Sequence, residues 1–118
     1  MTKNFMTKDL KLVNITTQDF GSAKDMELHD ARWEKMSKNY WPLLSKAGLV
    51  KLSKLKVWNK INKYRYIHIF EYKSKESYEN CQPIWKKVEN ELFQGLLVKM
   101  VSDKGLVVSE TDLTTIIN

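Results

Sequence analysis

His68 is the side chain in this sequence whose surroundings best suit proton-transfer chemistry. It stands in an alternating run of rings, with Tyr64, Tyr66, Phe70 and Tyr72 at the neighbouring alternate positions. A neutral imidazole in apolar surroundings can take a proton from an acidic phenol or enol. The resulting carbanion can react with dioxygen in a dry cavity without a metal. We therefore predict that His68 is a catalytic base. The competing interpretation is a buried histidine held by one hydrogen-bond partner.

Other polar and aromatic residues predict a pocket for a small aromatic molecule around this base. Asn14 is polar within an otherwise apolar stretch, and an inward-facing amide needs a partner such as a substrate carbonyl or a water. His29 lies one helical turn before Trp33, and two histidines without a third ligand make a poor metal site, so no metal is predicted. The rings supply flat apolar walls, or alternatively they are simply core. The candidate ligand-binding residues are Asn14, His29, Trp33, Tyr66, Tyr72 and Trp85.

Composition excludes several classes of protein. A chain of 118 residues fits one domain. Its single cysteine, Cys81, excludes an internal disulfide framework and a multi-cysteine zinc site. No apolar run approaches the roughly 20 residues of a membrane-spanning helix. Residues 1–9 lack the apolar core of a signal peptide and are predicted to be a flexible N-terminus. We therefore expect a cytoplasmic protein.

Hydrophobic periodicity, together with residues that typically begin or end helices and strands, predicts the elements that must position these side chains. Ser22 and Ser74 are predicted helix caps, and Gly48 and Gly95 follow the predicted helices. A loop is expected at residues 18–22, and a turn at residues 102–105 before a short fifth strand at 106–109. The other predicted strands cover residues 10–17, 49–58 (with a bulge near Ser53 or Lys54), 63–72 and 96–101.

The order of these elements predicts an α+β protein of the ferredoxin-like type, β-α-β-β-α-β, with a four-stranded antiparallel sheet. Two helices then cover one face of the sheet, whereas several strands are apolar on both sides. A second copy would cover the other face, so a homodimer is predicted. The domain is expected to span residues 10–110. Residues 111–118 would form a tail whose Ile116 and Ile117 contact a partner.

The end of the third strand and the start of the second helix carry a family resemblance. Residues 70–78, Phe-Glu-Tyr-Lys-Ser-Lys-Glu-Ser-Tyr, place an aromatic ring before a capping serine, and Asn14-Ile15-Thr16-Thr17 lies on the first strand. This resembles the dimeric α+β barrel superfamily, which includes antibiotic-biosynthesis-monooxygenase-like and haem-degrading proteins. The resemblance implies a homodimer that is either a cofactor-independent monooxygenase or a relative that binds a small molecule without turnover. Between Ser74 and Leu92 no histidine is available as the haem ligand of the haem-degrading branch, so no cofactor is predicted and haem is not expected.

The charge distribution leaves two other functions open. The net charge is +6, and no acidic residue lies between Glu34 and Glu71. Such a basic stretch fits a non-catalytic dimerisation module with an acidic partner, or simply a solvated surface. The RNA-recognition fold has the same element order, but its stacking positions on the third and first strands hold Arg65, Ile67 and Lys11 here. Nucleic acid is therefore the least favoured partner.

Overall fold

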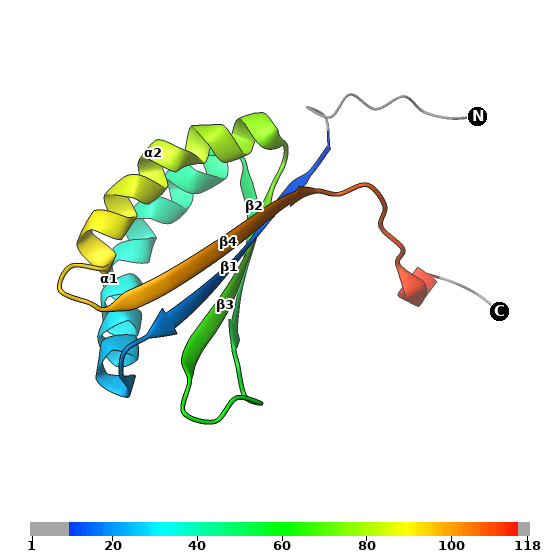
Figure 1. Ribbon diagram of the computed structural model, residues 1–118. Coiled ribbons are helices and arrows are strands. Elements are labelled where there is room, and N and C mark those ends of the chain that lie inside the picture. The colour runs from blue at the N-terminus through cyan, green and yellow to red at the C-terminus, as the bar shows by residue number, and fades with distance from the viewer. Residues whose placement is uncertain (1–9, 116–118) are drawn as a thin grey trace, which may run out of the picture.

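The computed structural model describes residues 10–115 and has the predicted order of elements (Figure 1). The predicted flexible terminus at 1–9 and the predicted contact through Ile116 and Ile117 lie outside the described residues. Among the described residues, no helix is both long and apolar enough to cross a membrane. The elements are β1 (Leu12–Phe20), α1 (Ala23–Ala47), β2 (Leu49–Lys56), β3 (Tyr64–Tyr72), α2 (Lys75–Leu92), β4 (Val98–Leu106) and a 3₁₀ turn (Leu113–Thr115).

The four strands form one antiparallel sheet in the order β2-β3-β1-β4, and both helices lie on the same face (Figure 1). Leu12 of β1 is paired with Tyr72 on one side and with Leu106 on the other, and the register continues to Phe20. This confirms the predicted α+β, ferredoxin-like fold. Because side chains alternate between faces, the even-numbered residues of β1, β3 and β4 point toward the helices.

Local capping explains where the helices begin and end. The Ser22 hydroxyl accepts a hydrogen bond from the Asp25 amide at 3.1 Å, and the Ser74 hydroxyl accepts one from the Ser77 amide at 3.1 Å. These bonds satisfy amides that have no partner inside the helix. Gly48 ends α1 with φ of 114°, a left-handed conformation that glycine adopts without steric cost.

The core lies between the helices and the sheet in two clusters. In the larger cluster, Leu44 and Cys81 are completely buried and Tyr72 is 1% exposed. The smaller cluster contains Phe20 and Met26. Fully burying one such aliphatic or aromatic side chain contributes about 1.5–3 kcal/mol, so these contacts hold the helices on the sheet.

Two strand predictions are wrong. β1 extends to Phe20, through the residues predicted as a loop, because residues 18–20 pair with both β3 and β4. The predicted turn at 102–105 and the fifth strand at 106–109 do not form, because β4 is one continuous strand along β1. In both cases pairing with a neighbouring strand overrides a local sequence that is typical of turns.

The bulge in β2 lies between Leu49 and Lys51, and not near Ser53 or Lys54 as the alternation predicts. The extra residue is Val50, whose side chain is 58% exposed. After the bulge, Leu52 is paired with Phe70 on the helix-facing side of the sheet. The irregular alternation therefore reveals that a bulge exists, but its position depends on the pairing of β2 with β3.

The sheet face turned away from the helices is apolar and uncovered. Ile15 is 45% exposed and Val101 is 58% exposed in the single chain. We call this surface the open sheet face, and it is formed mainly by Val13, Ile15, Leu55, Ile67, Ile69 and Val101. An apolar surface of this kind is typical of a protein contact.

Candidate functional site

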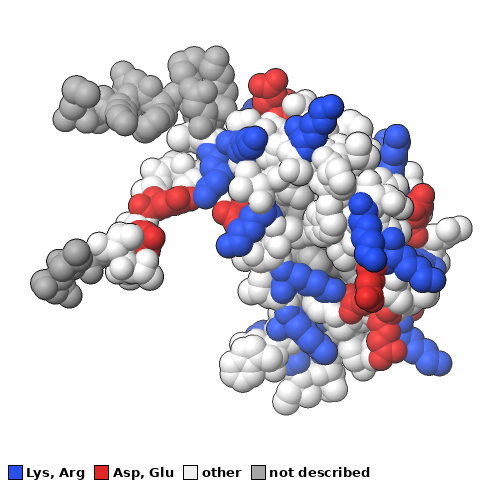
Figure 2. All heavy atoms as spheres, turned by 180° about the vertical axis from the view of Figure 1, so that it is seen from behind, with Lys and Arg blue, Asp and Glu red and all other residues white. Residues whose placement is uncertain are grey.

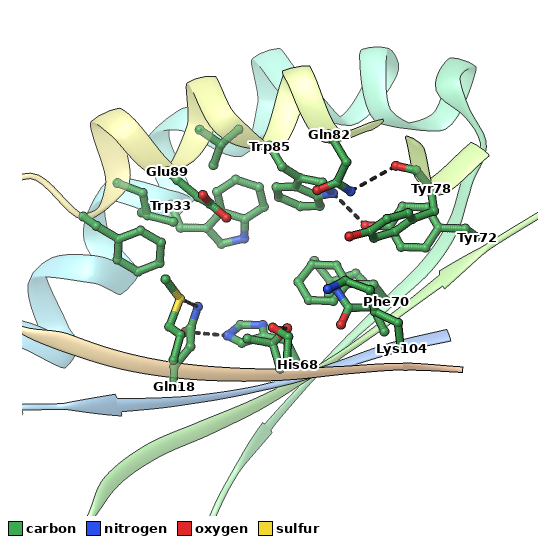
Figure 3. Close-up of a pocket in the computed structure, with 18 of the residues that line it drawn as sticks. Gln18, Trp33, His68, Phe70, Tyr72, Tyr78, Gln82, Trp85, Glu89 and Lys104 are labelled. Atoms are coloured by element: carbon green, nitrogen blue, oxygen red, sulfur yellow. Dashed lines mark hydrogen bonds between the residues drawn. The ribbon is translucent and has the colours of Figure 1, made fainter. Parts of the chain in front are cut away.

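A cavity of about 260 Å³ lies between the two helices and the helix-facing side of the sheet (Figure 3). Its walls come from both helices and all four strands, so no single segment contains the site. The aromatic lining residues are Trp33, Phe70, Tyr72, Tyr78, Trp85 and Phe93. The polar lining includes Asn14, Thr16, Gln18, His29, His68 and Ser102. Apolar walls with a few convergent polar groups are typical of a small-molecule site.

His68 lies on the sheet side of the cavity, beside Gln18 (Figure 3). Its Nε2 is 2.9 Å from the Gln18 Oε1. Because an amide oxygen only accepts hydrogen bonds, Nε2 carries the proton and Nδ1 keeps its lone pair. Burial, with a smaller effect from His29, lowers the pKa of His68 to about 4. The imidazole is therefore neutral at neutral pH and able to accept a proton.

Asn14 contributes a polar atom that lacks a partner. Its Oδ1 is buried and has no hydrogen bond within the described residues. A buried carbonyl without a partner costs about 1–3 kcal/mol, and a ligand donor would remove that cost. Nearby, the hydroxyls of Thr16 and Ser102 are bonded to each other at 2.8 Å, and only one hydrogen is used between them. This region can therefore both accept from and donate to a ligand.

Tyr72 and Trp85 form a linked pair of rings on another wall of the cavity (Figure 3). The Trp85 Nε1–H donates to the Tyr72 hydroxyl oxygen at 2.9 Å. Burial raises the pKa of Tyr72, although the bond from Trp85 opposes this, so the phenol stays protonated. Its own hydrogen remains available as a donor. The Phe70 ring packs edge-on against Trp85, with centroids 5.2 Å apart, and gives this wall a fixed shape.

His29 is anchored from outside the cavity by Asp30. The Asp30 carboxylate accepts hydrogen bonds from Lys54 Nζ at 2.6 Å, from the Tyr66 hydroxyl at 2.5 Å and from His29 Nδ1 at 3.2 Å. Burial opposes ionisation of Asp30, but these bonds outweigh it and lower its pKa. Burial also lowers the pKa of His29, against the effect of Asp30. The cavity is therefore lined by two histidines that burial keeps neutral.

Two charged residues also line the cavity. Glu89 projects from α2, and burial raises the pKa of its carboxyl. Lys104 projects from β4, with its Nζ 5.7 Å from the centre of the Tyr78 ring. In Figure 3 these two residues lie toward opposite ends of the cavity. The lining of the cavity therefore contains an acidic residue and a basic residue in separate places.

The structure brings six of the seven sequence-predicted site residues to this cavity, namely Asn14, His29, Trp33, His68, Tyr72 and Trp85. Tyr66 is not among the lining residues, because its hydroxyl is held by Asp30. Sequence reasoning missed Gln18, since the predicted first strand ends one residue before it. Continuing the alternation from Asn14 through Thr16 would have placed Gln18 on the same face of the sheet as Asn14.

The basic stretch is partly neutralised by acids from other parts of the chain. Arg65 pairs with Asp19 at 2.5 Å and Lys54 with Asp30 at 2.6 Å. Figure 2 shows lysine and arginine side chains interspersed with acidic ones on the face opposite the view of Figure 1. This mixture gives no broad surface of one sign on that face. Within residues 10–115, no group of three or more His, Cys, Asp or Glu side chains is arranged to hold a metal ion.

Comparison with solved structures shows which proteins share this fold. Two proteins from uncultured marine organisms, each described as a dimeric ferredoxin-like protein, are 29% and 33% identical, with TM-scores of 0.79 and 0.76. Each match covers 86% of this chain, and 99% and 98% of the marine proteins respectively. SnoaB from Streptomyces nogalater, described as a cofactor-independent oxygenase, matches with a TM-score of 0.59 and 14% identity. That match covers 88% of this chain and 97% of SnoaB.

These similarities confirm the resemblance expected from residues 70–78, and at 14% identity the likeness to SnoaB concerns the fold alone. No curated protein matches the chain by sequence. The family described as "Domain of unknown function (DUF6974)" matches residues 9–107, which is most of the chain. The chain therefore belongs to the DUF6974 family.

Proposed function

We propose that this protein is a homodimeric, small-molecule-binding protein that acts as a cofactor-independent monooxygenase on an aromatic or enolic substrate. The observation that carries the proposal is that two hydrogen-bond acceptors belong to residues that line one aromatic cavity. They are the buried Asn14 Oδ1, which has no partner, and the His68 Nδ1, which keeps its lone pair. Both can accept from a donor, and an acidic hydroxyl group is a donor whose proton can also be transferred.

The walls favour a small ligand with one or two rings. At about 260 Å³ the cavity is close to the lower end of the size range for ligand pockets. Trp33, Phe70 and Trp85 supply ring surfaces against which a planar molecule can stack. The Tyr72 hydroxyl can donate to a ligand oxygen. A phenol or enol with a carbonyl-like oxygen satisfies these groups together.

Proton transfer to His68 would begin the reaction. The substrate loses a proton to Nδ1, and the anion that remains pairs with the imidazolium in the same dry cavity. The carbanionic form then gives electrons to dioxygen and forms a carbon–oxygen bond. A methylene carbon that loses two hydrogens becomes a carbonyl, and the second oxygen atom leaves as water. The atoms and electrons of the substrate and dioxygen are therefore balanced in this reaction without a further reductant.

A second copy would cover the open sheet face. Ile15 and Val101 are about half exposed in the single chain, and Ile69, the partner of Ile15 on β3, is another aliphatic residue of that face. The described residues of this face carry no aromatic ring on β1 or β3 to stack on a nucleic-acid base. Relatives that are 29% and 33% identical are described as dimeric. The surface therefore favours a protein partner of the same kind.

Ligand binding and turnover can be tested separately. Quenching of tryptophan fluorescence by α-naphthol should saturate, whereas its methyl ether, which cannot donate a proton, should bind at least about 10-fold more weakly. Oxygen uptake with the enolisable ketone β-tetralone should fall about 100-fold or more in His68→Gln. Equal uptake by that variant would exclude His68 as the base. Saturable binding with no uptake by the wild type would exclude the monooxygenase and leave a non-catalytic binding protein.

The dimer can be tested by light scattering of the wild type and of Ile15→Lys. A lysine on the open sheet face would be buried without a partner in the dimer, so the variant should be monomeric or aggregated. Lys56→Ala, on the helix-facing side of β2, is a control that should remain dimeric. A wild-type protein that stays monomeric at high concentration would contradict this part of the proposal.

A further inference from the structure

After β4 the described part of the chain continues as an extended segment, residues 107–115, which we call the arm. At its root the Val107 amide donates to the Lys11 carbonyl oxygen at 2.8 Å, and Lys11 Nζ pairs with Glu110 at 2.5 Å. Beyond the root, Val108 is 87% exposed and Leu113 is 73% exposed. Figure 1 shows the arm leaving the end of β4 and running away from the body, on the side of the sheet opposite the helices.

The tip of the arm has a defined local structure. The Asp112 carboxylate accepts hydrogen bonds from the Thr114 amide at 3.0 Å and from the Thr114 hydroxyl at 2.5 Å. These bonds lower the pKa of Asp112 and hold the 3₁₀ turn in which Leu113 lies. An apolar side chain is thus presented to solvent on a capped turn.

The open sheet face contains a hollow that suits such a side chain. It has a volume of about 300 Å³, and it is lined by Val13, Ile15, Asp103, Lys104, Gly105, Leu106 and Val107. A Cβ atom added to Gly105 would meet no heavy atom within 4 Å, so the sheet surface is unfilled at this point. Aliphatic residues form most of this lining, which also contains Asp103 and Lys104. The hollow is uncovered in the single chain, and it lies on the same side of the sheet as the arm.

We propose that the arm packs on the open sheet face of a second copy of this chain, where Val108 and Leu113 fill the hollow around Gly105. This rests on the homodimer of the proposed function. The eight residues after Val107 span up to about 26 Å when extended, which exceeds the roughly 15 Å width of a four-stranded sheet. In a two-fold symmetric dimer each copy makes the same contact, so the arm of each copy would pack on the sheet of the other.

The arm is a feature of this chain beyond its family match. The match to the family ends at residue 107, where the arm begins. The arm therefore adds contacts to a dimer whose sheet faces are already apolar. It would stabilise the pair by burying side chains that a single copy leaves in water.

Sedimentation equilibrium of the full chain and of three variants tests this. A chain that ends at Val107 loses both apolar side chains and should raise the dimer dissociation constant about 100-fold or more. Leu113→Asp keeps the root contacts and should raise it roughly 10- to 100-fold. Gly105→Phe places a ring at the hollow, where the new Cβ meets no heavy atom within 4 Å, and should weaken the dimer comparably. Circular dichroism should show all three folded.

The matched control is Leu97→Asp, which changes a residue that is 77% exposed and lies just before β4, at the end of the strand away from the arm. Its dissociation constant should equal that of the wild type. If Leu113→Asp and the shortened chain dimerise as tightly as the wild type, the arm proposal is overturned while the dimer stands. If only Gly105→Phe has no effect, the hollow is not the docking site and the proposal also fails. A full chain that never dimerises would instead contradict the proposed function.

Discussion

The neutrality of buried His68 predicts how the stability of the protein depends on pH. The pKa of His68 is about 4 in the folded protein, against 6.5 for an exposed imidazole. Between these values the unfolded chain binds a proton that the folded protein does not. The contribution of His68 to the free energy of unfolding must therefore fall as the pH falls from 6.5 toward 4, and it must remain constant above this window.

The magnitude follows from the size of the shift. The difference of about 2.5 pKa units corresponds to about 3 kcal/mol at 1.36 kcal/mol per unit. Asp19 and Asp30 have lowered pKa values, so their stabilising effect is lost as the pH falls below about 4. Their effect therefore lies mostly below the window of His68. The shifts of His29 and Glu89 also change the stability in acidic solution, His29 in the same direction as His68 and Glu89 in the opposite one, so the contribution of His68 is obtained from the difference between the wild type and a His68 variant.

Urea unfolding at fixed protein concentration, followed by tryptophan fluorescence between pH 4 and 8, measures this effect. His68→Gln should lose the part of the slope between pH 6.5 and 4 that comes from His68, because glutamine does not titrate. His29→Gln is the matched control, and it should keep the part of the slope that comes from His68. If the wild type and His68→Gln lose stability in parallel, His68 is not kept neutral by burial. The proposed base would then be wrong.

Three further substitutions test particular contacts, each by urea unfolding. Asn14→Leu removes the unpartnered Oδ1 and should leave the free energy of unfolding unchanged or raise it by up to about 1 kcal/mol. Binding of α-naphthol should weaken. A large loss of stability would mean that the amide has a partner. Gly48→Ala should lower the free energy of unfolding by about 2 kcal/mol, because φ is 114° and the new Cβ would clash with Ser77. A neutral result there would contradict the left-handed cap. Trp85→Phe should lower the free energy of unfolding by about 1–2 kcal/mol, because the hydrogen bond to the Tyr72 hydroxyl is lost. An unchanged free energy of unfolding would show that this bond contributes nothing to stability.

Local patterns were sufficient for the helices but not for all of the strands. Ser22, Ser74 and Gly48 mark helix ends through bonds within a few residues, so their roles are visible in the sequence. The residues at 102–105 are typical of a turn, yet they lie in β4 because β1 pairs with them from a distance in the chain. Turn composition describes only what a segment prefers on its own, and strand pairing can outweigh it.

The site shows the same division between local and distant contacts. Alternation along β3 is sufficient to put His68 and Tyr72 on one face, and helical spacing does the same for Trp33 and Trp85 on their own helices. The sequence by itself thus determined the element order, the aromatic character of the site and the apolar second face of the sheet. Periods of two and 3.6 residues are sufficient to reveal these features.

Only the tertiary structure decided which partners these side chains have. Gln18 reaches His68 across two paired strands, and Asp30 joins His29 to Tyr66 and Lys54 from three different elements. Such contacts depend on strand register and helix placement, which no local pattern specifies. The cavity exists for the same reason, because it is the space left where two helices pack on a twisted sheet and its shape is set by all the elements together.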